Sequence, residues 1–131
     1  MVAAAGDLRI GDPPPERVGW NIGLRTFRLT PNKSLPLRNC AVSTSGDLFQ
    51  NVTSGGKTYS HLIELQTGLG LTTRRAASVI MPEAKMTDPL ATIACLSDNP
   101  EALFKKFPGA SIRIVYEDRK IPPITTGIFT E

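Results

Sequence analysis

Residues 77–96 read ASVIMPEAKMTDPLATIACL. The first five form a short apolar run that Pro82 ends, a pattern typical of a buried strand. Within residues 87–96, apolar side chains recur at the i, i+3, i+4 spacing of a buried helix face, namely Leu90, Ile93 and Ala94. Pro89 fits such a helix in its first turn, where the missing N–H costs nothing. The stretch therefore predicts a strand followed by a helix that packs on a sheet.

Turn-forming residues divide the rest of the chain into short strands. The predicted strands are residues 7–10, 17–29, 39–44, 48–52, 57–64 and 111–116. Prolines 13–15 are expected to join the first two strands in a β-hairpin, and residues 53–56, which include two glycines, are expected to join 48–52 to 57–64. A second short helix is predicted at residues 100–107, with Asn99 or Asp98 as its cap.

The order of these elements indicates the fold class. Strands and short helices mix without regular strand–helix–strand alternation, which favours an α+β fold with a mainly antiparallel sheet and a few short helices packed on it. The length of 131 residues suits a single domain spanning 1–131. Hydrophobic residues make up 40% of the chain and charged residues 21%, as in ordinary globular proteins.

Composition excludes several classes of function. The net charge of +3 is spread along the chain, and only 6% of residues are aromatic, so the footprint of a nucleic-acid binder is missing. No apolar run approaches the roughly 18 residues that a membrane span needs. The first residues lack the basic flank of a signal peptide, so we expect either a cytosolic protein or a start further upstream. Cys40 and Cys95, with a single histidine, form no metal-ligand pattern, and two free buried thiols are expected.

Asp88 and Thr92 carry the clearest chemical signal. They lie one helical turn apart, on the face opposite the predicted apolar stripe, where Cys95 is also expected. A carboxylate and a hydroxyl so placed offer the oxygen ligands that Mg²⁺ prefers when phosphates and waters complete its shell. The alternative is structural, because an aspartate before a proline is a common helix N-cap.

Two further segments carry candidate functional groups. His61, the only histidine, is expected within a strand, where it can serve either as a catalyst or as a packed residue. The segment STSGD, residues 43–47, offers hydroxyls, a glycine and an acid in a turn after a strand. Such a turn can bind phosphate or ribose through its backbone N–H groups, or it can be a hydrogen-bonded turn without further function.

Six segments, in this order, resemble the second half of the ApbE family of flavin transferases. They are residues 5–11 (AGDLRIG), 19–24 (GWNIGL), 41–47 (AVSTSGD), 59–68 (YSHLIELQTG), 78–84 (SVIMPEA) and 87–92 (TDPLAT). The family uses Mg²⁺ to cleave the pyrophosphate of FAD, which places FMN on a threonine of an acceptor flavoprotein and releases AMP.

The resemblance implies a role for each matching residue. Asp88 and Thr92 fall where the family binds magnesium, and His61 falls at its FAD-contacting, proton-handling histidine. The remaining residues match segments that line the same cleft, namely Asp7, Ser45, Gly46 and Asp47. Full-length relatives are often periplasmic lipoproteins, and a homo-oligomer is compatible with the pattern.

The chain also departs from the family pattern. Ile63-Glu64-Leu65 stands where the family has Ile-Asp-Pro, and Pro89 replaces a small helix-forming residue. Family members are longer, and their upstream half supplies further flavin contacts and another magnesium ligand, so we expect this chain alone to be inactive. Two alternative functions are an FAD- or nucleotide-binding module without transfer activity and a degenerate structural fragment.

Overall fold

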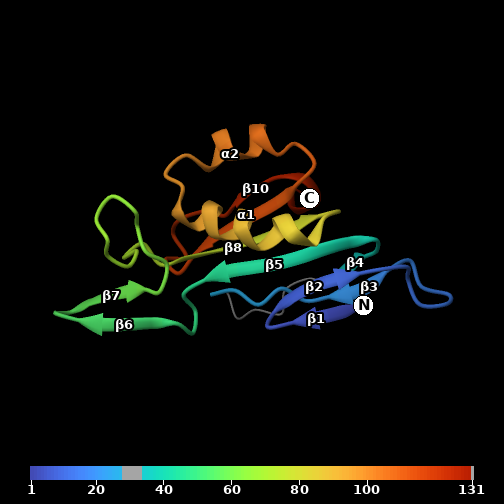
Figure 1. The fold of residues 1–131 in the computed structure, drawn as a ribbon, viewed down its shortest axis with the longest axis horizontal. Helices are drawn as coiled ribbons and strands as arrows, with labels where there is room; N and C mark the ends of the chain where they lie inside the picture. Colours follow the sequence, from blue (N-terminus) through green and yellow to red (C-terminus); the bar gives the residue numbers. More distant parts are fainter. Residues whose placement is uncertain (28–33, 131) are drawn as a thin grey trace.

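The computed structural model of the chain describes residues 1–27 and 34–130. Its central element is a six-stranded sheet in the order β1-β2-β5-β8-β9-β10, in which all neighbouring strands are antiparallel (Figure 1). The strands of this sheet are β1 (Val2–Ala4), β2 (Asp7–Ile10), β5 (Cys40–Gly46), β8 (Arg75–Met81), β9 (Ser111–Tyr116) and β10 (Ile124–Thr125). The expected α+β class with a mainly antiparallel sheet is confirmed.

Two small ribbons and the helices complete the described fold. The ribbons pair β3 (Trp20–Ile22) with β4 (Leu35–Leu37), and β6 (Asn51–Ser54) with β7 (Lys57–Ser60). The helices are α1 (Ala84–Leu96), α2 (Pro100–Lys106) and the 3-10 helix η1 (Gly127–Phe129). Both α-helices lie over one face of the sheet, and the β6–β7 hairpin projects beyond the end of β5 (Figure 1). In the part of the chain that the structure describes, no helix is long and apolar enough to span a membrane.

Each face of the sheet carries its own apolar core, because strand side chains alternate between the faces. On the helix side, Leu90 and Ala94 of α1 pack with Val79 and Ile112 of the sheet. The opposite core lies between the sheet and the β3–β4 ribbon, and its buried members are Ile10, Ile22, Leu24, Leu37, Val42 and Ile80. Helix α1 is therefore fixed against β5 and β8, which sets the direction of its remaining side chains.

Helix α1 differs from its sequence prediction in two respects. It begins at Ala84 instead of residue 87, so Glu83 is the N-cap and Asp88 is not. Pro89 lies in the second turn and not in the first, and its missing N–H leaves the Lys85 carbonyl without its helical partner. Both residues are exposed, so water can bond to that carbonyl.

The buried stripe of α1 is also shifted from the predicted one. The buried residues follow an i, i+3, i+4, i+7, i+8 pattern and are Thr87, Leu90, Ala91, Ala94 and Cys95. Ile93, expected inside, is 47% exposed, and Cys95, expected on the outer face, is fully buried. The stripe begins with a threonine whose hydroxyl is satisfied by the Ala84 carbonyl at 2.9 Å and by Ser43 Oγ at 2.7 Å.

The predicted hairpins have different outcomes. The hairpin between residues 7–10 and 17–29 is wrong, because β2 pairs with β1 and β5 whereas β3 pairs with β4. Ala5 and Gly6, with φ of 48° and 108°, form the tight turn that joins β1 to β2. The hairpin of β6 and β7 is confirmed with shorter strands that turn at Gly55-Gly56. Residues 28 and 29 of the predicted strand lie outside the described residues.

Candidate functional site

A cavity of about 330 Å³ opens where the end of β5, the β1–β2 turn, the segment after β7 and helix α1 converge. Six of the residues that line it are among those singled out in the sequence. They are Asp7, Ser45, Gly46, His61, Asp88 and Thr92. These positions are widely separated in the chain, so it is the sheet order that brings them to one place.

Helix α1 contributes Asp88 and Thr92 to the cavity from one face. Thr92 Oγ1 lies 2.9 Å from Ser45 Oγ, which ties the helix to the end of β5. Asp88 is exposed and, among the described residues, takes part in no ion pair. Its carboxylate thus remains available to a ligand that enters the cavity.

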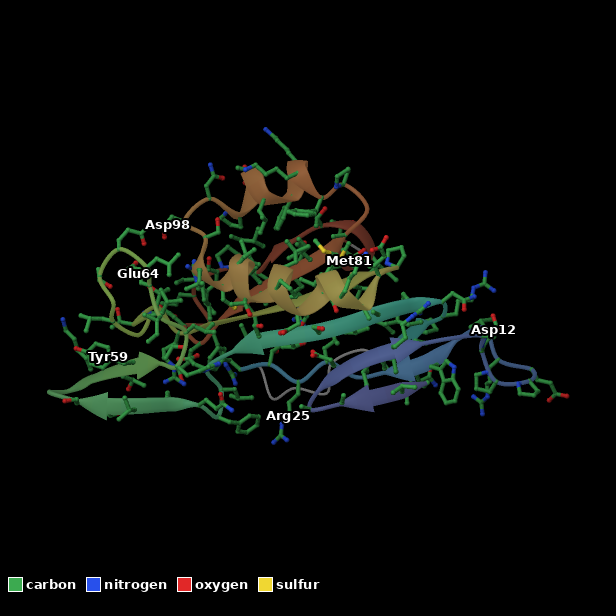
Figure 2. The ribbon with its side chains drawn as sticks, viewed as in Figure 1. Asp12, Arg25, Tyr59, Glu64, Met81 and Asp98 are labelled. Carbon is green, nitrogen blue, oxygen red and sulfur yellow. The ribbon has the colours of Figure 1, made fainter. Side chains whose placement is uncertain are left out.

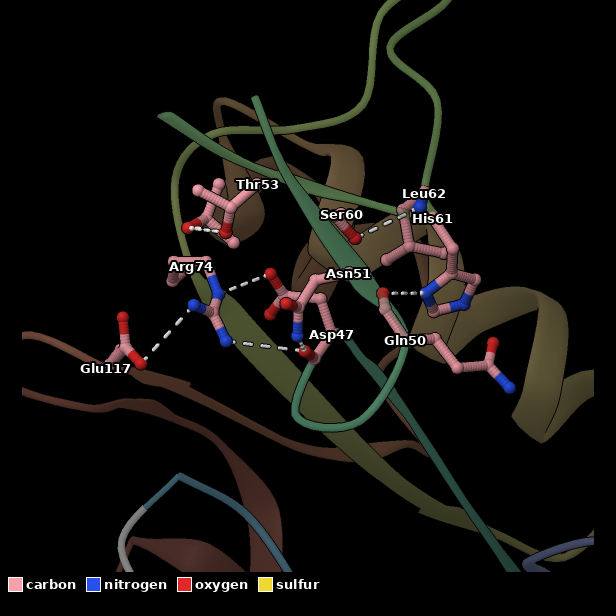
Figure 3. Close-up of polar contacts among 10 residues, drawn as sticks. Asp47, Gln50, Asn51, Thr53, Ser60, His61, Leu62, Arg74 and Glu117 are labelled. Atoms are coloured by element: carbon pink, nitrogen blue, oxygen red, sulfur yellow. Dashed lines mark hydrogen bonds and ion pairs between the residues drawn. The ribbon is translucent and has the colours of Figure 1, made fainter. Parts of the chain in front are cut away.

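His61 lies just after β7 and not inside a strand as expected. The strand ends because the buried Ser60 hydroxyl accepts a hydrogen bond from the Leu62 amide at 3.0 Å, which turns the chain. The imidazole is exposed toward the cavity, and its Nδ1 lies 3.1 Å from the Gln50 carbonyl oxygen (Figure 3). Among the described residues, Nδ1 is the ring nitrogen with a hydrogen-bond partner, which leaves Nε2 for a ligand.

Gly46 occupies a position where only glycine fits without strain. Its φ of 153° lies in a region that side chains rarely adopt, and an added Cβ would lie 2.6 Å from Ala76 Cβ on β8. The close approach of the two strands here leaves the Gly46 backbone at the wall of the cavity.

The structure does not bring Asp47 to the cavity, contrary to its expected role in cofactor binding. Its side chain is 1% exposed and forms an ion pair with Arg74, with Nε and Oδ2 2.5 Å apart (Figure 3). Burial raises the pKa of Asp47, and the Arg74 charge only partly opposes this rise. The Asp47 carbonyl also accepts hydrogen bonds from Asn51 Nδ2 at 2.7 Å and from Arg74 Nη2 at 3.4 Å.

Comparison with known proteins identifies the family. The ApbE family model matches residues 1–109. The chain belongs to the ApbE family. A curated relative, the FAD:protein FMN transferase of Treponema pallidum (strain Nichols), is 31% identical over 123 residues, with 88% of this chain and 33% of that protein covered.

Solved ApbE structures share the fold. The ApbE protein of Thermotoga maritima is similar with a TM-score of 0.78 and 26% identity, over 97% of this chain and 42% of that one. The flavinyl transferase ApbE of Pseudomonas stutzeri gives a TM-score of 0.76 and 25% identity, over 96% and 40%. The chain thus spans less than half the length of these relatives.

The cavity that contains His61 and Asp88 has two lining residues that lie outside the segments singled out in the sequence, Phe49 and Gln50. Thr44 and Leu62, from within those segments, also contribute to its walls. Phe49 also borders an adjoining hollow of about 250 Å³, whose walls include the apolar side chains Leu8, Leu24 and Val42. The Arg25 guanidinium lies 4.7 Å from the Phe49 ring centroid, on the side of the sheet opposite to the helices (Figure 2). No local sequence signal marks this pair, because chain folding alone brings the two residues together.

The donor atoms of the cavity suit a hard cation. Among the described residues, no group of three or more His, Cys, Asp or Glu side chains is placed to hold a metal ion. The Asp88 carboxylate and the Thr92 hydroxyl are hard oxygen donors on one helix face, which fits Mg²⁺ that retains waters and binds substrate phosphates.

Proposed function

We propose that this chain forms the magnesium- and histidine-bearing side of a site that transfers FMN from FAD to a threonine of an acceptor flavoprotein, with release of AMP. The observation that supports this most directly is that one cavity gathers Asp88 and Thr92 with His61. Two of the ApbE relatives are named as transferases of this kind, one as an FAD:protein FMN transferase and one as a flavinyl transferase. Because the chain covers only part of them, the remaining contacts to FAD would come from the rest of such a protein.

The shape of the two hollows supports FAD as the ligand. The larger cavity is walled mainly by polar and charged groups, and the adjoining hollow mainly by apolar side chains, with Arg25 among its lining residues. They share Thr44, Ser45, Gly46 and Phe49. A molecule that joins flat apolar rings to a charged diphosphate matches this division.

Asp88 and Thr92 would hold the cation at the diphosphate. When bound there, Mg²⁺ supplies positive charge that offsets the phosphate oxygens and polarises the phosphorus under attack. The Asp88 carboxylate binds and orients this charge from one turn of α1. Thr92 binds it from the next turn, and its contact with Ser45 keeps the hydroxyl aimed into the cavity.

His61 would move the proton. A threonine hydroxyl is a weak nucleophile at neutral pH, so a base must accept its proton as the new O–P bond forms. Within residues 1–27 and 34–130, the ring is engaged only through Nδ1, with the Gln50 carbonyl, so Nε2 can serve as this base. The bond between the FMN phosphorus and the bridging oxygen breaks, and AMP leaves with that oxygen.

One departure from the family pattern, Glu64-Leu65 in place of Asp-Pro, lies in a loop after His61 that is held by hydrogen bonds of its own. The Glu64 carboxylate accepts a hydrogen bond from Thr67 Oγ1 at 2.8 Å. The Glu64 amide donates to the Leu69 carbonyl at 2.9 Å, and the Gly68 amide donates to the Glu64 carbonyl at 2.8 Å. These hydrogen bonds restrain the loop in the absence of the proline. This supports a functional position for His61.

A chimera tests the proposal. This chain would replace the stretch it aligns with in the Treponema pallidum transferase, and the product would be incubated with FAD, Mg²⁺ and a threonine-bearing acceptor. Mass spectrometry should show FMN on the threonine, and chromatography should show an equal amount of AMP. Asp88→Ala should abolish turnover, and His61→Ala should slow it by about 10²–10⁴-fold.

Other outcomes would point elsewhere. FAD binding by the chimera without AMP release would favour a binding module. Full turnover in Asp88→Ala would overturn the site assignment.

A further inference from the structure

One carbonyl oxygen, that of Gln50, receives two hydrogen bonds from His61. The His61 backbone amide lies 3.1 Å from it, and the ring nitrogen Nδ1 also lies 3.1 Å from it (Figure 3). A carbonyl only accepts hydrogen bonds, so Nδ1 must carry a proton whether the ring is neutral or charged. In the neutral ring the lone pair is then on Nε2.

The chain segment that carries this carbonyl is held at both of its ends. The Asp47 carbonyl accepts from Asn51 Nδ2 at 2.7 Å, which closes the segment from 47 to 51 on itself. Arg74 reaches the same residue twice, with Nε 2.5 Å from Asp47 Oδ2 and Nη2 3.4 Å from the Asp47 carbonyl (Figure 3). Glu117 contacts Arg74 Nη1 from the other side at 3.4 Å.

Burial makes this arrangement costly to break. The Asp47 side chain is 1% exposed and that of Arg74 is 19% exposed. Removal of one partner would leave a charge out of water without compensation. The ion pair stands outside the cavity, and its effect on the site passes through the backbone between Asp47 and Gln50.

We propose that Asp47 and Arg74 are positioning residues that fix the Nδ1–H tautomer and the orientation of His61 by holding the Gln50 carbonyl in place. This rests on the proposed function, in which Nε2 accepts the proton of the acceptor hydroxyl. A neutral imidazole without such a partner exchanges between two tautomers, and only one of them offers Nε2 as a base. The pair thus keeps the histidine in the form that the reaction uses.

Nitrogen NMR of the chain tests this directly, because His61 is the only histidine and its two ring nitrogens need no further assignment. The spectrum is taken at a pH high enough that the two nitrogen shifts no longer change when the pH is raised further. In the unsubstituted chain, the Nδ1 and Nε2 shifts should be widely separated, with Nδ1 in the protonated range. In Asp47→Asn, which preserves side-chain size, the two shifts should move toward each other as the tautomers mix.

Two further variants keep the test decisive. Asn51→Ala alters an exposed residue that should not be needed for folding, and it should also narrow the separation. Lys85→Gln removes an ion pair with Glu83 on the exposed start of α1 and should leave the shifts unchanged. The proposal is overturned if Nε2 carries the proton in the unsubstituted chain, or if folded Asn51→Ala and Asp47→Asn both keep the original separation. Should Asp47→Asn fail to fold, Arg74→Lys takes its place, because an ammonium lacks the fork of donors that meets the Asp47 carboxylate and carbonyl together; an unchanged separation in that variant also overturns the proposal.

The measurement is independent of the transfer reaction. It needs no FAD, metal or acceptor, so an unchanged separation in the variants removes the positioning role and leaves the proposed transfer standing. Conversely, a chimera that lacks transfer activity, built from a chain whose His61 shows the expected tautomer, would remove the proposed transfer and leave the positioning role standing.

Discussion

Ser45 and Thr92 are joined through their hydroxyl groups, with the two oxygens 2.9 Å apart, and this contact ties the end of β5 to the third turn of α1. Two other polar contacts run beside it. Ser43 Oγ lies 2.7 Å from Thr87 Oγ1, and the Cys95 thiol donates to the Ser45 carbonyl at 3.4 Å. Together they fix the rotation of the helix about its axis. Asp88 is thereby held toward the cavity that contains His61.

Replacement of Thr92 should separate its structural and ligand roles. Thr92→Val keeps the shape but removes the hydroxyl, so Ser45 loses its partner and the cation loses an oxygen. We expect a loss of about 1 kcal/mol in the free energy of unfolding, together with weaker magnesium binding. Thr92→Ser should retain both properties. Urea denaturation and magnesium titration in the presence of FAD would measure them, and equal magnesium affinity in the two variants would contradict the ligand role.

A side chain at Gly46 should disturb the pairing of β5 with β8. The new methyl group would meet Ala76 at 2.6 Å from Cβ to Cβ, on a backbone with φ of 153°. Gly46→Ala should therefore lower the free energy of unfolding by about 1–3 kcal/mol. Gly11→Ala is the matched control, since nothing lies within 4 Å of its added Cβ. Thermal denaturation that is equal in the two variants would show that the strands are not so close.

The stability of the chain should depend on pH through Asp47. Burial raises the pKa of this carboxyl above its ordinary 3.8, so the native state binds the proton more tightly than the unfolded state does. The stability that this proton contributes is fully present below pH 3.8 and is lost as pH rises through the raised pKa of the native state. The stability of Asp47→Asn relative to the unsubstituted chain should therefore increase from acid to neutral pH. Urea unfolding at several pH values measures this, and parallel curves would contradict it.

The two cysteines should differ in reactivity. Both are free, Cys40 is partly exposed and Cys95 is buried. Burial raises the pKa of Cys95 to about 12, so its thiolate is scarce at neutral pH and its sulfur is out of reach of a reagent. A thiol reagent at about pH 8 should label Cys40 first and Cys95 only on unfolding. Peptide mass mapping locates the label, and early modification of Cys95 would show that α1 is less tightly packed than the structure indicates.

Elements with a strong alternation of apolar residues were predicted well. Strand β9 spans Ser111–Tyr116 as expected, because Ile112 and Ile114 both point into the core on the helix side. The rotation of α1 about its axis was not predicted, because its buried stripe begins with Thr87, a polar residue whose hydroxyl is satisfied only by contacts made on folding.

The observed stripe of α1 predicts how substitutions on the helix affect stability. Leu90→Ala should lower the free energy of unfolding by about 2–5 kcal/mol. A polar substitution of Ile93, which is 47% exposed, should leave it nearly unchanged.

Strand pairing and part of the site depend on the whole fold. Strand β1 was not predicted, because all of its residues are exposed and show no exposed–buried alternation. The turn after it places Ala5 at a positive φ, which an alanine in the sequence does not indicate. The resemblance to the family indicated six of the residues that line the cavity, namely Asp7, Ser45, Gly46, His61, Asp88 and Thr92. Asp47 was also expected to line the cleft. Its side chain instead lies in the interior, where it pairs with Arg74, a residue 27 positions away in the chain.

In the proposed site, Asp88 and Thr92 hold a divalent cation beside His61. The most direct test replaces Mg²⁺ with paramagnetic Mn²⁺ in the chimera saturated with FAD and follows the ring signals of His61, which are identified by their loss in His61→Ala. These signals should broaden in the unsubstituted chimera and remain sharp in its Asp88→Ala variant at the same Mn²⁺ concentration. Equal broadening in the two proteins, or no broadening of His61 in either, would contradict it.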